Sequence, residues 1–399
     1  MAIRKIVARS IGVDVITAED LADNSVTVAE ISNGAVTTAK INDGAVTLAK
    51  LSATGTKDAT TFLRGDNSFQ VVAVTPTAIS DQANSSTGYF DLPTGTTAER
   101  PETAANGQIR FNSTTGYMEY YSASYGWITV ASPYSVDVLI VAGGGGGTWG
   151  TGSGGSGAGG LLYGSTTVNP QISYSLVIGA GGAAGVSNGI GSVGSNSTGF
   201  GVTSNGGGVG AKNGGTGLVG GSGGGASGAS VNSSNRPATS ATQGSSSGFT
   251  GLGNAGGTTT GSSYYAGSGG GGAGAVGGNH NGSSSSPGGN GGAGYTWLNG
   301  TTYAGGGGGA NENVVGRSIG GAGGGGAGGD GSQNPVSGTA NTGGGAGGAG
   351  LGGSGTPATG GSGVVIIRYL GSQKATGGTV TSSGGYTYHT FTSSDTFIA

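Results

Sequence analysis

The stretch Val136-Asp-Val-Leu-Ile-Val-Ala-Gly-Gly-Gly-Gly-Gly147 decides the fold, because an apolar strand pattern runs directly into the first long glycine run. A matching apolar stretch, Val364-Val-Ile-Ile-Arg-Tyr369, follows the last glycines of the same block. Two apolar strands that bracket a glycine-rich sequence indicate one domain whose ends pair, since a flexible linker needs no such pairing. The pair can form only if the residues between the two strands are compact.

Most of the chain's 100 glycines lie between these strands, in runs such as 269–272, 305–309 and 323–326. Such a block has too little apolar surface for an ordinary core, so it is either disordered or held by hydrogen bonds between backbones. Polyproline II geometry has about three residues per turn and points every N–H and C=O sideways. Without Cβ atoms, neighbouring runs can satisfy each other's amides. We therefore predict a lattice of polyproline II (polyglycine II) runs held between β-strands. Collagen is excluded, because glycine is not at every third position and proline numbers only 9.

Composition narrows the function classes. Charged residues make up 8% of the chain, the net charge is −3 and cysteine is absent. No basic stripe is present that could follow nucleic acid, and no apolar window reaches the roughly 20 residues of a membrane span. We predict no nucleic-acid partner and no membrane insertion. The charged residues within the glycine block are few: Lys212, Arg236, Glu312, Arg317 and Asp330.

Near the N-terminus the sequence repeats every ten residues. Ile16-Thr, Val26-Thr, Val36-Thr and Val46-Thr recur in register, and each is followed by a charged residue and then Leu or Ile. Asn-Gly and Asp-Gly pairs between copies favour tight turns. Each unit is therefore predicted to be a β-branched pair, a short helical turn and a reversal. One unit has too few apolar side chains to bury them alone, so stacking on neighbours and on other chains is expected. A soluble two-helix segment is the alternative.

Further short strands are predicted on either side of the first glycine run. Three β-rich stretches, 109–111, 117–121 and 127–130, are separated by turn residues and form a sheet that is marginal without partners. Inside the block, 172–178 and 199–203 also have strand composition. At the C-terminus, Tyr386, Tyr388 and Phe391 are expected on one face of a hairpin, which covers the same β layer or packs against another chain.

No arrangement of residues suggests catalysis. The two histidines, His280 and His389, are far apart in sequence and have no cysteine or acidic pair nearby. Paired carboxylates for glycoside hydrolysis are not visible, and GxGxxG matches arise from composition alone. We predict no enzyme, no cofactor, no metal site and no catalytic residue.

Binding is the better-supported class of function. Aromatic residues among Asn and Ser follow or precede several glycine runs, and such rings can stack on sugars. They can equally cap the lattice and bury its few apolar contacts. Both alternatives stay open for the six candidate receptor-binding residues: Trp149, Tyr264, Tyr265, Tyr295, Trp297 and Tyr303.

Several segments resemble fibre proteins of tailed bacteriophages, particularly phages that infect cyanobacteria. They are TTFLRGDNSF (60–69), LPTGTTAERP (92–101), VDVLIVAGGGGG (136–147), YAGSGGGGAG (265–274), YAGGGGGA (303–310) and GSGVVIIRY (361–369). The first departs from the family pattern, since Asn67 and Phe69 replace Gly and Trp. The Arg64-Gly-Asp66 tripeptide in it is interpreted as a turn.

The resemblance implies a mainly β, fibrous homotrimer located in the virion. Its N-terminus would bind a tail or capsid protein, and its glycine-rich tip would meet a host cell-surface polysaccharide or protein. The expected organisation is an anchor (1–15), stalk repeats (16–51), a connector (52–75), a small β module (76–132), the glycine-rich domain (133–370) and a C-terminal hairpin (371–399). A tail fibre that binds the receptor is the first hypothesis, a capsid-bound decoration fibre (whisker) the second, and a cell-wall-degrading tail enzyme the third.

Overall fold

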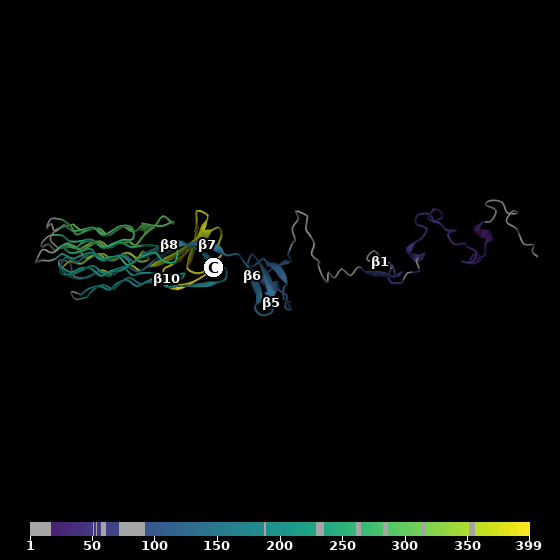
Figure 1. Cartoon of the computed structure of the whole chain (residues 1–399), viewed down its shortest axis with the longest axis horizontal. Helices are drawn as coiled ribbons and strands as arrows, with labels where there is room; N and C mark the ends of the chain where they lie inside the picture. Colours follow the sequence, from purple (N-terminus) through teal and green to yellow (C-terminus); the bar gives the residue numbers. More distant parts are fainter. Residues whose placement is uncertain are drawn as a thin grey trace, which may run out of the picture. The chain divides into compact units, whose positions relative to one another are not determined.

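The protein is mainly β in a computed structural model (Figure 1). Helical residues in the described part form only single 3-10 turns. The chain forms two compact units, Met1–Phe90 and Asp91–Ala399. The residues described are 17–50, 52, 54–56, 61–71, 92–186, 189–228, 235–260, 265–281, 286–312, 316–350 and 356–399.

In the first unit the ten-residue repeats have the predicted form. The 3-10 turns η2 (Ala18–Asp20), η3 (Thr38–Lys40) and η4 (Leu48–Lys50) alternate with tight reversals. In each reversal an N–H donates to the carbonyl oxygen three residues earlier, as Ala35 does to Ser32 at 2.9 Å. The repeats are therefore turns in series, and the two-helix alternative is wrong for the described residues.

The connector contains a short hairpin. Strands β1 (Thr61–Leu63) and β2 (Phe69–Val71) pair antiparallel. Between them the N–H of Asn67 donates to the carbonyl oxygen of Arg64 at 3.0 Å. Asn67 has a φ of 61°, in the left-handed region that asparagine tolerates better than most residues. The Arg-Gly-Asp tripeptide thus lies in the hairpin turn, as the sequence predicts.

The second unit begins with the small sheet that the sequence predicts. Its strands lie in the order β3-β4-β5-β6, with β3 parallel to β4 and the other pairs antiparallel. The bounds are β3 Thr94–Gly95, β4 Ile109–Asn112, β5 Tyr117–Ser122 and β6 Gly126–Val130, with the 3-10 turn η5 at Thr97–Glu99.

The small sheet is held together by a buried carboxylate. Glu119 has no exposed surface and pairs with Arg100 at 2.6 Å and with Arg110 at 3.6 Å. The hydrogen bond from Arg100 lowers the pKa of Glu119 from its ordinary value, despite the opposing effect of burial. Removing one partner of such a network leaves a buried charge uncompensated.

The glycine-rich domain is built on an antiparallel six-stranded sheet in the order β12-β8-β7-β15-β17-β16. β7 pairs with β15 so that Val141 lies opposite Val364, which confirms the pairing predicted for the two apolar strands that bracket the glycine block. The bounds are β7 Tyr134–Val141, β8 Leu161–Val168, β12 Thr250–Leu252, β15 Val364–Leu370, β16 Thr379–Ser383 and β17 Tyr386–Phe391.

Both faces of this sheet are buried, and side chains alternate between them. Along β7, Val138 and Ile140 enter one core, whereas Leu139 and Val141 enter the other. The first core is closed by a second layer in which β9 pairs with β18 and lies beside β10. The second core is closed by the lattice and by the pair β13–β14. The bounds are β9 Ser173–Leu176, β10 Ser197–Gly199, β11 Val202–Ser204, β13 Tyr295–Thr296, β14 Thr302–Tyr303 and β18 Asp395–Ile398.

Two sequence-based expectations are wrong in detail. Phe391 does not share a face with Tyr386 and Tyr388: it is buried in the first core, whereas Tyr388 packs against the second. The reason is the two-residue period of a strand, which places residues 388 and 391 on opposite faces. The segment 199–203 is not one strand either, because Phe200 and Gly201 form the turn between β10 and β11.

The C-terminal segment is part of the glycine-rich fold. β17 pairs with β15 in the middle of the sheet, and β18 pairs with β9 in the second layer. Phe397 and Phe391 lie in the first core. The boundary expected at residue 370 therefore does not separate two structural units, and the hairpin extends the same β layer.

The glycine runs extend from the sheet side by side as an array (Figure 1). The hydrogen bonds between neighbouring runs recur every third residue. The N–H of Gly143 donates to Ser195 and that of Gly146 to Ser192, at 3.1 and 2.9 Å. Gly144 donates to a different run, at Gly361. Three residues per turn is the period of polyproline II. This confirms the predicted lattice of polyglycine runs.

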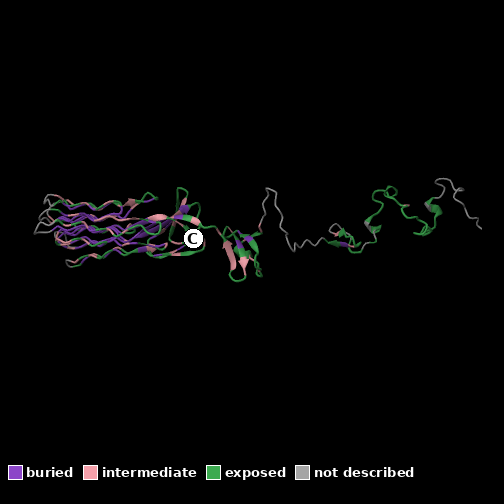
Figure 2. Cartoon of the chain, viewed as in Figure 1, coloured by how far each residue is buried: buried purple, intermediate pink, exposed green. Residues whose placement is uncertain are grey.

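The run 153–160 is surrounded by six others and is here called the central run. Its N–H groups donate to three runs, and its carbonyl oxygens accept from three further runs. Figure 2 shows that runs in the middle of the array are buried along most of their length. The three acceptor runs are 205–211, 268–271 and 343–346, and the three donor runs are 142–145, 222–225 and 307–310.

Candidate functional site

The lattice has two ends, which the hydrogen-bond registers define. Gly160, at one end of the central run, accepts from Ala142 beside β7, so this is the sheet end. Ser153, at the other end, accepts from Ala310 and marks the distal end. At about 3.1 Å per residue, the two ends of the central run are about 20 Å apart. A ligand at one end therefore does not touch the other.

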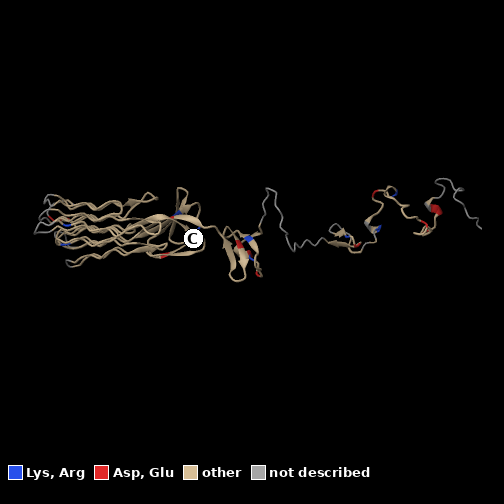
Figure 3. Ribbon diagram, viewed as in Figure 1, with Lys and Arg blue, Asp and Glu red and all other residues tan. Residues whose placement is uncertain are grey.

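The distal end is tied together by charged side chains that bind backbone groups. Glu312 accepts the N–H of Gly152 at 2.8 Å. Arg236 donates to the carbonyl oxygens of Gly214 at 2.6 Å and Ser227 at 3.2 Å. Where a run ends, its outermost N–H and C=O groups have no further run to pair with, and these side chains supply partners. Figure 3 shows how few charged residues the glycine-rich domain carries.

A second pair of charges caps neighbouring runs. Arg317 donates to the carbonyl oxygens of Gly328 at 2.8 Å and Asn334 at 2.7 Å. Asp330 accepts the N–H groups of Ser332 at 2.9 Å and Gln333 at 2.7 Å. Burial raises the pKa of the Asp330 carboxyl, but these hydrogen bonds outweigh it and keep the pKa below its ordinary value. These two charged side chains therefore supply hydrogen-bond partners for backbone groups where neighbouring runs end.

Two of the six candidate receptor-binding residues lie at the distal end. Trp149 follows the run 142–148 and is half-buried, with its N–H donating to Gly189 at 3.1 Å. Tyr265 is half-buried, and its carbonyl oxygen accepts the N–H of Glu312 at 3.0 Å. Their rings therefore lie on a surface whose backbone is fixed. Tyr264 lies outside the described residues.

The other three candidates lie at the sheet end. Trp297 and Tyr303 are 4% and 6% exposed and belong to the second core, beside Leu139 and Val141. Tyr295 is half-buried and stacks on Tyr163, with ring centroids 4.9 Å apart.

For these three residues the structure favours the packing alternative over ligand stacking. The physical reason is that the glycine runs contribute only the methyl groups of Ala158, Ala273 and Ala304 to the second core, so larger aromatic rings fill it. Trp297 and Tyr303 thus pack in the second core and expose little of their surface, and a receptor-binding role for them stays a prediction.

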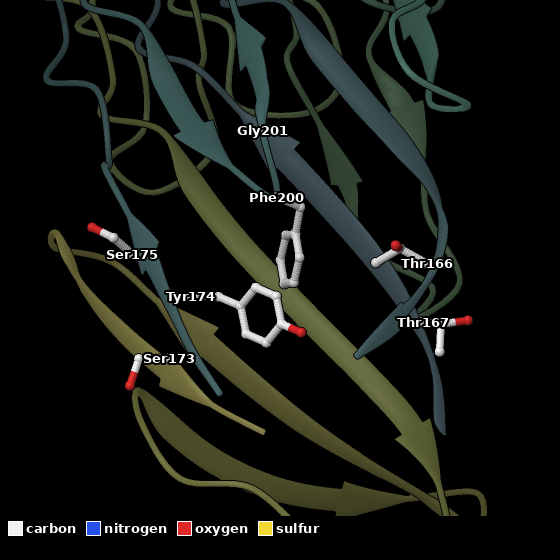
Figure 4. Close-up of a pocket in the computed structure, with 7 residues that line it drawn as sticks. All are labelled: Thr166, Thr167, Ser173, Tyr174, Ser175, Phe200 and Gly201. Carbon is white, nitrogen blue, oxygen red and sulfur yellow. The ribbon is translucent and has the colours of Figure 1, made fainter. Parts of the chain in front are cut away.

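A solvent-open pocket that the sequence did not predict lies at the sheet end (Figure 4). It has a volume of about 400 Å³ and lies between β8, β9 and the β10–β11 turn. Tyr174 and Phe200 stack in it with ring centroids 5.1 Å apart. The available signal was the Gly-Phe-Gly sequence at 199–201, which places an aromatic residue in a turn. The lining residues are Thr166, Thr167, Ser173, Tyr174, Ser175, Phe200 and Gly201.

Both histidines are buried side chains of the described structure. His389 is buried, with Nε2 2.9 Å from the hydroxyl of Tyr369 and Nδ1 2.8 Å from the carbonyl oxygen of Gly377. His280 is also buried. The residues described include no group of three His, Cys, Asp or Glu side chains that could hold a metal ion. None of the helices described is long and apolar enough to cross a membrane.

Comparison with known proteins gives one match. A family model described as a glycine-rich domain matches residues 121–370, which is more than half of the chain. The matched region begins in β5 and ends with β15, so it includes the lattice and the two central strands of the sheet. No curated protein and no solved structure matches the chain.

Proposed function

We propose that this chain, which belongs to the family of glycine-rich domains, is a structural fibre of a tailed-bacteriophage virion whose glycine-rich domain binds a host receptor. The segments 60–69 and 92–101, which resemble phage fibre elements, support the virion assignment. The observation that carries the binding role is the central run with its six hydrogen-bonded neighbours. Such a lattice fixes the backbone beneath the distal residues and lets the residues at its end vary.

Assembly into a homotrimer is part of this proposal. The apolar residues of the repeats are spaced five apart and stay exposed in a single chain: Leu21 46%, Val26 49%, Ile31 44%, Val36 56%, Ile41 41% and Val46 52%. Regularly spaced apolar side chains of this kind fit burial against other copies of the chain. In a trimeric fibre stalk, the other two chains would bury the apolar side chains of these repeats.

The receptor-binding surface is assigned to the distal end. Trp149 and Tyr265 combine an apolar ring with surrounding hydroxyl and amide groups, which suits a host polysaccharide or protein. The backbone nearby is held by Glu312 and Arg236. The surface is therefore pre-organised, which lowers the entropy lost on binding.

Binding to host cells tests this role. Purified full-length protein is expected to bind host cells and to block infection. Replacing both distal rings, Trp149→Ala with Tyr265→Ala, should weaken cell binding by about tenfold or more, as loss of an aromatic contact typically does. Tyr125→Ala is the matched control, because Tyr125 is 82% exposed in the small sheet, away from the lattice. Equal binding by the distal variant and the control would exclude the distal end as the receptor surface.

Labelling of virions separates the first hypothesis from the second. Antibody against the glycine-rich domain is expected to mark the tail. Labelled capsids, together with unblocked infection, would instead identify a capsid decoration fibre. Release of sugar from host polysaccharide would revive the third hypothesis, a tail enzyme, for which the described residues offer no clustered acids.

A further inference from the structure

The pocket between β8, β9 and the β10–β11 turn contains an aromatic residue in a strained position. Phe200 has a φ of 51° and is followed by Gly201 with a φ of 76°. Two left-handed residues joining antiparallel strands form a type I′ turn, which favours Asn-Gly. A phenylalanine in that conformation costs about 1–2 kcal/mol. Strain of this kind is a reason to look for a function of the side chain.

Phe200 packs against the first core, but this packing buries only part of the residue. The ring lies near Phe397, with centroids 6.4 Å apart, but the residue is only half-buried. Tyr174 stacks on it and is half-buried as well. Together the two rings form an aromatic wall that is open to solvent along the pocket (Figure 4).

Hydroxyl groups lie beside this wall. Thr166 is on the same face of β8 as Val168, which enters the first core, and Figure 4 shows its side chain pointing toward the side of the pocket that Phe200 lines. The hydroxyl of Tyr174 accepts the N–H of Asn169 at 3.1 Å, which leaves its own proton to donate. Thr167 and Ser173 point away from the two rings (Figure 4). None of the lining residues is charged.

We propose that this pocket binds a neutral saccharide. The apolar face of a sugar ring would lie against Phe200 and Tyr174, while its hydroxyls exchange hydrogen bonds with Thr166 and the tyrosine hydroxyl. The volume of about 400 Å³ is within the range of small-molecule sites. The lining offers no charged partner for the carboxylate of an acidic sugar, so a neutral sugar fits the pocket better. This site is at the sheet end, so it goes beyond the receptor surface proposed at the distal end.

The experiment is saturation-transfer NMR on the full-length protein. The probes are the methyl glycosides of glucose, galactose, mannose and N-acetylglucosamine, with sialic acid as the charged comparison. At least one neutral glycoside is expected to receive saturation, with a dissociation constant of about 1 mM for so open a site. No transfer to any neutral glycoside, or transfer to sialic acid alone, would overturn the proposal.

Substitutions locate the binding. Phe200→Asn suits the turn, so it should keep or raise the melting temperature and reduce saturation transfer by about tenfold. Thr166→Val keeps a β-branched residue on the strand and removes the hydroxyl, so it should weaken binding several-fold. Tyr125→Ala should leave binding unchanged. If Phe200→Asn fails to fold, the saturation transfer measured for Thr166→Val tests the proposal. Wild-type binding in either folded pocket variant, or loss of binding in Tyr125→Ala, contradicts the assignment.

These measurements use free sugars and purified protein. They are independent of virion labelling and of infection blocking. If no saccharide binds the pocket, the proposed fibre function is not affected. If the protein proves not to be part of a virion, the proposal that the pocket binds a saccharide is not affected.

Discussion

At Gly157, in the middle of the central run, the requirement for glycine comes from a carbonyl oxygen. A Cβ on Gly157 would lie closer than 3.0 Å to the carbonyl oxygen of Ser222, which accepts the N–H of Gly208. The next residue, Ala158, carries a fully buried Cβ. Methyl groups are therefore accommodated at chosen positions of a run, and glycine is needed where a neighbouring backbone approaches.

Gly157→Ala is expected to destabilise the glycine-rich domain by about 3 kcal/mol, because the methyl group must push a hydrogen-bonded carbonyl aside. Gly244→Ala is the matched control in the same domain, since an added Cβ there meets nothing within 4 Å. Denaturant unfolding of both variants measures the difference. Similar denaturation midpoints for Gly157→Ala and Gly244→Ala would show that the runs around Gly157 can move apart to accept a methyl group.

His389 gives the fold a dependence on pH. The carbonyl oxygen of Gly377 can only accept, so Nδ1 carries the proton. The hydroxyl of Tyr369 already accepts the N–H groups of Lys374 and Ala375, so its proton goes to Nε2. Burial lowers the pKa of His389 below its ordinary value of 6.5, although the bond to Gly377 opposes this shift. The imidazole is therefore neutral in the folded protein.

The sign of the pH effect follows from this shift. Above pH 6.5 the ring is neutral in both the folded and the unfolded chain, and the stability is fully present. Below 6.5 only the unfolded chain takes up the proton, so stability falls by about 1.4 kcal/mol per pH unit until the folded pKa is reached. The test is the free energy of unfolding of the wild type and of His389→Gln, measured from pH 7 down to the pH at which carboxylates begin to titrate. If the free energy of unfolding falls with pH as steeply in His389→Gln as in the wild type, the pH dependence comes from other groups.

At the scale of elements, the paired strands and the period of the runs could be predicted from sequence, whereas the neighbours of each run could not. Apolar alternation identifies β7 and β15, and the absence of Cβ atoms implies polyproline II. The choice of neighbour depends on turn lengths and on single Ser or Ala residues, such as Ser156, whose hydroxyl donates to the carbonyl oxygen of Gly146 at 2.7 Å. Such signals are too weak to find among similar runs.

The candidate site was less predictable than the fold. Composition identified aromatic residues near glycine runs, but it could not separate the distal end from the sheet end, because both ends consist of loops between similar runs. Only the hydrogen-bond register of the central run, with Ser153 at one end and Gly160 at the other, separates the distal end from the sheet end. Trp297 therefore lies in the second core, and the sequence did not single out Phe200, which lies in the two-residue turn between β10 and β11.

The stalk repeats lead to a prediction about assembly. Val26, Val36 and Val46 recur every ten residues and are about half exposed. Replacing all three by Ser should weaken association, because each buried valine contributes about 1.5 kcal/mol or more at every copy of the interface. Light scattering should give three times 37.3 kDa for wild type and a concentration-dependent lower mass for the variant. A monomeric wild type would contradict the trimer, and an unchanged mass for the variant would exclude the valines from the interface.

For the molecule as a whole, stability of the glycine-rich domain depends on contacts between residues far apart in the chain. Gly155 donates to Ser268, and Ser156 donates to Ala346. The polyproline II conformation has no internal hydrogen bonds, so a run that adopts it is not stable by itself. The domain is therefore expected to unfold as one cooperative unit, with the two strand-lined cores and the lattice lost together.

The C-terminal segment tests this cooperativity. Ending the chain at Leu370 removes β17 from its pairing with β15, and takes Phe391 and Phe397 out of the first core. Loss of one buried phenylalanine side chain costs about 3–5 kcal/mol. Removal of both therefore costs about as much as the whole stability of many domains. We expect the chain 1–370 to show no cooperative transition in calorimetry. The chain 91–399, which keeps the second compact unit, should melt as that unit does in the full-length protein. A cooperative transition in 1–370 would mean that the lattice and the two central strands fold without the C-terminal strands.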